Sequence, residues 1–192
     1  MTSSCSRRKR NKNSIIVHEC TGTFNYIHDN PCRPAILNYL AIQYTAFSGF
    51  GFSTQTRFLV ESLIQWANSD LHRNAGFNLS YPSCLDKYRL RSDHANEELV
   101  EFGLKNFSKQ LECIERGYLK KAPFLTGDRL TVADSFVATV VLQAQWNGFQ
   151  FQMWPKVEKW LRQVRAQEFW SQVHHDHNAL VQELDKEQFS FD

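Results

Sequence analysis

The feature that most constrains the fold is a nearly continuous apolar segment that carries a single carboxylate close to its start. The segment TVADSFVATVVLQAQW runs from Thr131 to Trp146. Its apolar residues recur at helical spacing and cover almost the whole circumference, which predicts a helix buried at the centre of a bundle. The first backbone N–H groups of a buried helix cannot bond to water, and each unpaired donor costs about 1–3 kcal/mol.

The carboxylate stands where it can satisfy those donors. Thr131 and Asp134 have the three-residue spacing of a capping box, in which the hydroxyl accepts from the third helical residue and the acid accepts from the N–H of the cap. The positive end of the helix dipole also favours a negative charge at this point. We therefore interpret Thr131 and Asp134 as a structural capping box. A catalytic role for Asp134 as a general acid is the weaker alternative.

Helical periodicity extends over the chain from Thr56 onward. The pattern predicts a helix from Thr56 that Pro82 breaks or kinks, a helix that starts at Pro155, and a final helix over about 167–185. The most regular pattern covers 93–119, where apolar residues alternate steps of four and three: Val100, Leu104, Phe107, Leu111, Ile114 and Tyr118. In the first of these helices, the residues in register are Phe58, Leu59, Leu63, Trp66 and Leu71.

The part of the chain before this helical region has a different character. Residues 1–13 are polar and basic and are predicted to be disordered, and the short β-branched runs 14–19 and 21–27 predict an antiparallel pair of strands. Pro34 suits the first turn of a helix over 35–44, and a linker follows over 45–55. We therefore expect a small α/β segment in front of the helices.

Charge and cysteine usage limit the classes of partner and compartment. Residues 7–12 hold five cations, and the remaining chain has 17 basic against 20 acidic residues, so the body is mildly acidic. This argues against a nucleic-acid partner, although the tail could be a nuclear address, a nucleic-acid arm or a solvated start. The sequence has no apolar run long enough to span a membrane, and we expect no signal peptide. Five scattered cysteines fit a reducing cytoplasm or nucleus better than disulfides or zinc.

Several segments together resemble the glutathione S-transferase family. PFLTGDRLTVADSFVA resembles the capping-box segment that opens the buried core helix of that family's C-terminal domain. TRFLVESLIQWANSDLHRN is similar to the first long helix of the domain, especially in the theta class, and WPKVEKWLRQVRA is similar to the helix after the core helix. PAILNYLAIQY resembles the helix that closes the family's thioredoxin-like N-terminal domain.

The resemblance implies a mainly α fold. We expect an all-helical glutathione-transferase C-terminal bundle over 56–186, a partial thioredoxin-like α/β remnant over 14–44, and a disordered basic tail over 1–13. The family's first strand, which carries the reactive hydroxyl or thiol, and the cis-proline before its third strand have no counterpart in this chain. A family dimer pairs the N-terminal domain of one subunit with the helical domain of the other, so part of that surface is expected to be missing.

The implied activity is conjugation of the thiol of glutathione, a co-substrate rather than a cofactor, to small electrophiles. A thiol with a pKa of about 8.5 is mostly protonated at neutral pH, so this chemistry needs a donor that stabilises the thiolate. Because the donor strand is missing, we expect poor or no activity. The alternative is a non-catalytic docking module like the transferase-like domains of translation elongation and tRNA-synthetase complexes. A shortened splice or gene-model product is a third possibility.

Candidate site residues also follow from the resemblance. Cys32 and Arg33 align with the family's glutathione-binding Glu-Ser pair, and Asp70 is a candidate contact for the glutathione amine. Trp66, His72 and Arg73 lie where the first helix would pass the electrophile cleft. A solvated helix face is the alternative for this helix.

Two further groups of residues are candidates for chemistry. Cys20 and Cys32 could act as substitute thiols, although a packing role is the simpler interpretation. His174, His175 and His177 lack the spacing of helical metal ligands, so we expect a surface cluster of histidines and no metal site.

Overall fold

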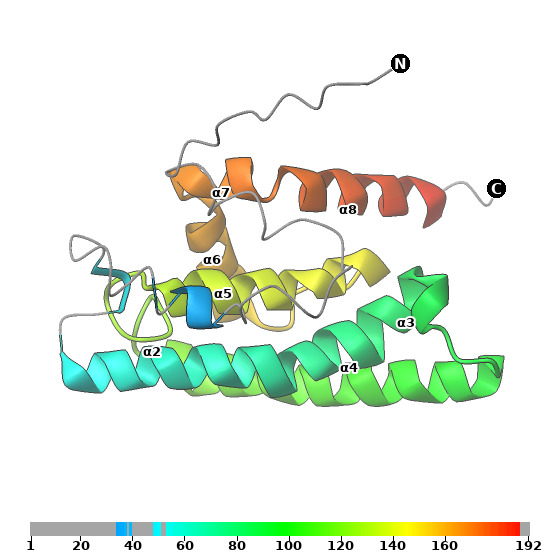
Figure 1. Ribbon diagram of the computed structural model, residues 1–192, viewed down its shortest axis with the longest axis horizontal. Coiled ribbons are helices and arrows are strands. Elements are labelled where there is room, and N and C mark those ends of the chain that lie inside the picture. The colour runs from blue at the N-terminus through cyan, green and yellow to red at the C-terminus, as the bar shows by residue number, and fades with distance from the viewer. Residues whose placement is uncertain (1–33, 38, 40–47, 51–52, 189–192) are drawn as a thin grey trace, which may run out of the picture.

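The computed structural model describes residues 34–37, 39, 48–50 and 53–188, and in this part the protein is an all-helical bundle (Figure 1). The two predicted strands and the boundaries of the tail lie outside the described residues. The principal helices are α2 (Thr54–Trp66), α3 (Tyr81–Cys84), α4 (Asp93–Arg116), α5 (Val132–Leu142), α6 (Pro155–Arg165), α7 (Glu168–Val173) and α8 (His175–Gln188). Short 3-10 turns cover Ser48–Phe50, Asp86–Tyr88, Tyr118–Lys120 and Gln143–Asn147.

The first helical rod begins at α2 and continues well beyond it. Ser53 caps α2, because its hydroxyl accepts from the Thr56 N–H at 3.0 Å. After Trp66 the backbone changes to wider π-helical turns over Ala67–Leu71 and Arg73–Ser80, and then enters α3. The break expected at Pro82 is wrong, because the helical backbone continues through this proline, which lies in the first turn of α3. The kink stays a prediction. The helical backbone ends at the extended Leu85.

Helix α4 runs back alongside this rod, with a very close approach between the two backbones. A Cβ atom added to Gly103 would lie 2.5 Å from the Asn78 carbonyl oxygen, so only glycine permits this crossing. Phe107, Leu111 and Ile114 are fully buried, as the periodicity predicts. Leu104 is 40% exposed instead, because Gly103 makes the contact with the first helical rod and the next residue along α4 points away from that contact.

A second residue of the predicted apolar pattern also faces outward. Phe58, in the first turns of α2, is 67% exposed, whereas Val60, Leu63 and Ile64 of the same helix are buried. The buried face of α2 is therefore rotated relative to the one predicted from Phe58.

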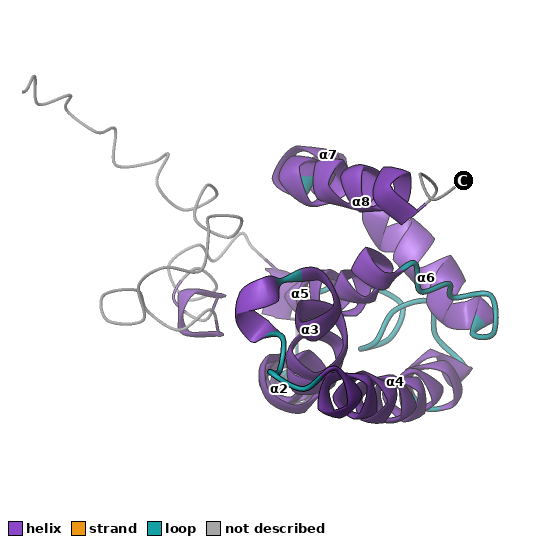
Figure 2. Cartoon of the chain, turned by 90° about the vertical axis from the view of Figure 1, so that its right-hand side faces the viewer, coloured by secondary structure: helices purple, strands orange, loops and turns teal. Residues whose placement is uncertain are grey.

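Helix α5 occupies the centre of the bundle. It lies between the α2–α4 layer and the helices α7 and α8 (Figures 1 and 2). Its buried residues occupy all sides of the helix: Val132, Ala133, Asp134, Val137, Ala138, Val140, Val141 and Leu142. The prediction of a central core helix is confirmed.

The C-terminal region differs from its prediction by one break. The single helix expected over 167–185 is instead two helices, α7 and α8, because the backbone leaves helical geometry at His174. Pro155 begins α6 as predicted, and Val157, Trp160, Leu161 and Val164 form its buried face. Among the described helices, none combines the length and the apolar character that crossing a membrane would require.

Candidate functional site

The Asp134 carboxylate is the most highly connected polar group described in the bundle. It is 0% exposed, and the structure contains both arms of the capping box at the start of α5. Its Oδ2 atom accepts from the Thr131 N–H at 2.8 Å and from the Thr131 hydroxyl at 3.0 Å. Its Oδ1 atom accepts from the Leu125 N–H at 2.8 Å and from the Trp160 indole N–H at 2.9 Å.

These four donors give Asp134 a second function beyond capping. The Leu125 N–H belongs to the loop before α5, and the indole belongs to α6, so one carboxylate joins three segments of the chain. A fully buried acid whose two oxygens are both occupied by protein donors has no surface to offer a substrate. The geometry fits a structural role.

A second buried acid repeats this arrangement at α6, and the sequence analysis missed it. Glu115, near the end of α4, is 8% exposed. Its carboxylate accepts from the N–H groups of Lys156 and Val157, each at 2.9 Å, and so caps α6 from another helix. Trp154, the N-cap residue of α6, makes no side-chain cap hydrogen bond, so those donors are satisfied from another helix.

The predicted residues of the first helix are divided between two faces. Asp70 and Arg73 lie together on the outside, 57% and 65% exposed at their side chains, with their charged atoms 3.7 Å apart. Trp66 is partly buried and packs against Tyr118, with ring centroids 6.5 Å apart. His72 points inward and is 8% exposed. Cys32 and Arg33 lie outside the described residues.

His72 belongs to a buried polar and aromatic cluster that the sequence did not reveal. Its Nε2 atom lies 2.7 Å from the Tyr81 hydroxyl, which in turn lies 3.4 Å from Gln143 Oε1. The rings of Phe77 and Trp146 pack on Tyr81, with centroids 5.1 and 5.8 Å away. This cluster ties the π-helical turns to the end of α5.

Arg73 also borders a shallow groove between the first helical rod and α4. The groove has a volume of about 360 Å³. It is lined by Arg73, Asn74 and Asn78 on one side and by Phe102, Asn106, Lys109 and Gln110 on the other. Of the predicted site residues that the structure describes, only Arg73 lines it.

The thiol of Cys84 is not a reactive nucleophile. It lies 3.1 Å from Asn147 Oδ1 and 3.3 Å from the Trp146 carbonyl oxygen. Burial raises the pKa of this thiol to about 11, so it is protonated at neutral pH.

The predicted surface cluster of histidines is wrong for His174. This ring is 7% exposed and stacks on Trp170, with centroids 3.7 Å apart. Its Nε2 atom lies 3.1 Å from the Thr139 hydroxyl of α5. The interruption of the helix between α7 and α8 turns the His174 side chain inward toward α5, whereas His175 stays exposed. In the described part of the chain, no group of histidine, cysteine and acidic side chains could hold a metal ion.

Comparison with known proteins agrees with this architecture. Residues 82–168 match the family model of the glutathione S-transferase C-terminal domain. No curated protein sequence matches the chain.

Solved structures show the same fold at low sequence identity. A delta-class glutathione transferase from Nilaparvata lugens is 20% identical with a TM-score of 0.65, over 79% of this chain and 68% of that one. A glutathione transferase homologue from Sulfitobacter with bound glutathione is 14% identical with a TM-score of 0.64, over 77% and 68%. Human glutathione S-transferase T1-1 is 22% identical with a TM-score of 0.63, over 79% and 63%.

The residues that match the family model form helices of the described bundle. The match over 82–168 contains α4, the Asp134 capping box, α5 and all of α6. Residues 82–168 therefore match a glutathione S-transferase C-terminal domain, and the described helices have the fold of solved glutathione transferases.

Proposed function

We propose that this protein is a theta-like glutathione-transferase-type protein that binds glutathione and conjugates it to small electrophiles, slowly or not at all. Glutathione is the co-substrate, and no other cofactor is required. The observation that carries the proposal is the match of residues 82–168 to the family's helical domain. The likeness to human glutathione S-transferase T1-1 supports a theta-like relationship.

The exposed edge of the first helix supplies the proposed binding groups. Asp70 is positioned to pair with an ammonium group, and Arg73 is positioned to pair with a carboxylate or to stabilise negative charge on an electrophile. Their mutual ion pair is solvent-exposed and therefore weak, so a ligand can compete for either side chain.

The expectation of slow turnover rests on the requirement for a thiolate. Conjugation is fast only where a hydroxyl or thiol donor lowers the pKa of the glutathione thiol. The Cys84 thiol is protonated and packed against carbonyl oxygens, so it is no substitute. We place the protein in the cytoplasm, with the nucleus as a second location through the basic segment 7–12.

The experiment is binding to immobilised glutathione combined with a conjugation assay on 1-chloro-2,4-dinitrobenzene. We expect specific elution by free glutathione and little turnover. The Arg73→Gln variant should bind glutathione or electrophile more weakly, and Arg89→Gln, which removes an exposed arginine paired with Asp93, is the matched control. Robust turnover would overturn the expectation of low activity, and absence of any glutathione binding would overturn the proposal itself.

A protein-docking function is the second candidate, and exposed apolar side chains favour it. Phe58 on α2 and Phe102 on α4 are 67% and 56% exposed, so each offers a large apolar side chain that a partner could cover. A second copy of this chain is one such partner, and its binding would form a homodimer. Size measurement and affinity capture, on the native chain and on the Phe58→Ser/Phe102→Ser variant, test this function. It is refuted if the native chain is a monomer and captures no protein that the variant fails to capture.

A further inference from the structure

A second cavity shares no lining residue with the groove beside Arg73, and none of the predicted site residues that the structure describes lines it. It has a volume of about 240 Å³ and is formed by the end of α5, the turn after it, the loop 149–154 and helix α6. Its lining residues are Leu142, Gln145, Gln150, Phe151, Gln152, Glu158, Leu161, Arg162 and Arg165. This volume is below the ~300–1,000 Å³ of sites for drug-sized ligands, so a fitting ligand is small.

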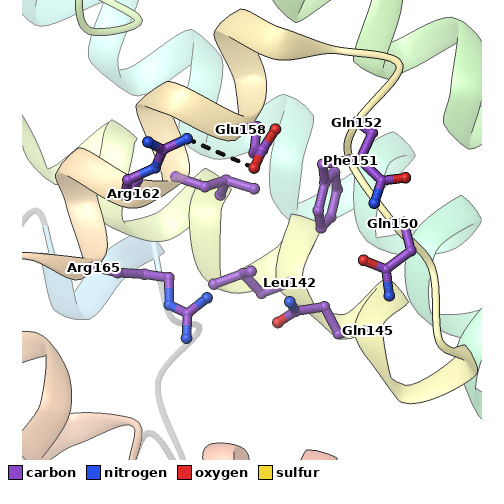
Figure 3. Close-up of a pocket in the computed structure, with 9 residues that line it drawn as sticks. Leu142, Gln145, Gln150, Phe151, Gln152, Glu158, Arg162 and Arg165 are labelled. Carbon is purple, nitrogen blue, oxygen red and sulfur yellow. Dashed lines mark ion pairs between the residues drawn. The ribbon is translucent and has the colours of Figure 1, made fainter.

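The cavity combines an apolar floor with a polar rim. Leu142, Leu161 and Phe151 are 3%, 4% and 7% exposed, so the floor is built from core side chains with fixed positions. Figure 3 shows the arginines of α6 on one side and Gln150 and Gln152 of the loop on the other. A ligand with a short apolar body and a polar head matches this division.

The charged side chains of the rim determine which charge on the ligand's polar head would bind favourably. Arg162 is already paired with Glu158, with 3.6 Å between their charged atoms. Among the side chains that the structure describes, no acid forms an ion pair with Arg165. Within the described residues, Arg165 therefore gives the cavity one positive charge that no acid matches, and the amide N–H groups of the glutamines add neutral donors.

Two histidines lie close enough to Arg165 for its charge to act on them. Burial is the first cause that lowers the pKa values of His174 and His177, and the positive charge of Arg165 lowers both further. Two neutral histidines next to Arg165 leave its charge available to an anion.

We propose that this cavity binds a small monocarboxylate with a short aromatic or aliphatic body, whose carboxylate pairs with Arg165 and whose body covers Leu142, Leu161 and Phe151. A guanidinium binds a carboxylate through two parallel N–H donors, which gives the site its preference for acids over neutral molecules of the same shape. The site is separate from the exposed pair Asp70 and Arg73, and it does not depend on glutathione binding.

The test uses the full chain with 3-phenylpropanoate and with its neutral isostere 3-phenylpropanamide. Binding is followed through backbone amide shifts in two-dimensional NMR spectra. The acid is expected to bind about tenfold more tightly than the amide, which corresponds to one partly exposed charge-assisted contact. The shifts should centre on residues 150–152 and on the last turns of α6.

Two variants separate the proposed contact from a general effect of net charge. Arg165→Gln is expected to bind acid and amide equally, whereas Arg89→Gln, which removes the same charge elsewhere on the surface, keeps the tenfold preference. Melting temperatures establish that both variants are folded. The proposal is overturned by equal binding of acid and amide to the native chain, by a preference that survives Arg165→Gln, or by the absence of saturable binding up to about 10 mM.

Discussion

Removal of the Asp134 carboxylate is the perturbation whose effect the structure defines best. The Asp134→Ala variant removes the acceptor of four donors, namely the N–H groups of Thr131 and Leu125, the Thr131 hydroxyl and the indole N–H of Trp160. Each unpaired donor costs about 1–3 kcal/mol, and local relaxation reduces their sum. We therefore expect the free energy of unfolding to fall by about 3–5 kcal/mol, among the large losses that follow when a buried hydrogen-bond network is broken.

That loss is a large part of the ~5–15 kcal/mol by which a domain of this size is stabilised. Urea unfolding followed by helical circular dichroism and by tryptophan fluorescence measures it. The matched control is Asp128→Ala, an exposed acid in the same loop, which should change stability by less than about 0.5 kcal/mol. A loss below about 1 kcal/mol for Asp134→Ala would refute the assignment of Asp134 as the polar centre of the bundle.

Three further predictions follow from other close contacts. Gly103→Ala should lower the free energy of unfolding by about 1–3 kcal/mol, because the new methyl group meets the Asn78 backbone at 2.5 Å; urea unfolding measures this. Glu115→Gln should lower it by about 1–2 kcal/mol, because the N-terminus of α6 loses its negative partner, whereas Glu112→Gln on the exposed face should not. Burial lowers the pKa of His177 to about 4 from its unfolded value of about 6.5, so the unfolded chain binds the proton more tightly and stability falls by about 1–3 kcal/mol as the pH drops between those values. A His177→Gln variant should show a flatter dependence on pH over that range.

Each of these predictions has a specific contradictory outcome. An unchanged stability of Gly103→Ala would mean that α4 and the π-helical turns are further apart than described. Equal effects of the two glutamate variants would exclude the cap on α6. An identical pH dependence in the native chain and the His177→Gln variant would place the titration elsewhere.

The central helix and its cap were predictable because both depend on short-range spacing. The recurrence of apolar residues after Thr131 indicates a buried helix, and the three-residue interval to Asp134 indicates the cap without any knowledge of the rest of the fold. The third and fourth partners of that carboxylate were not predictable. Trp160 is 26 positions away, and only the packing of α6 brings its indole N–H to 2.9 Å.

The contacts that the sequence analysis missed depend on packing between distant segments. Glu115 lies 42 positions before Val157, and an acid near the end of a helix gives no local signal that it caps another one. His174 looked like a surface residue, because the interruption between α7 and α8 that buries it has no proline or glycine to mark it. Leu104 fits the helical period as well as Gly103 does, and only the close backbone crossing decides between them.

The candidate site was less predictable than the fold for a related reason. Helical spacing places Asp70 and Arg73 on one face of the first helix, and the structure pairs them there. The same spacing does not indicate that His72 turns inward to Tyr81, because that depends on the wider turns between Arg73 and Ser80. Sequence periodicity assumes a regular helix, and it loses its register where the helix is not regular.

The most direct test of the central claim is the deuterium exchange rate of the Trp160 indole N–H in the native protein, measured by NMR. If the Asp134 carboxylate seals the core helix from within the bundle, this N–H exchanges only on global unfolding. Its rate should then match that of the slowest backbone amides of α5. Exchange of the indole N–H well ahead of those amides would contradict the buried contact, and with it the central position of α5.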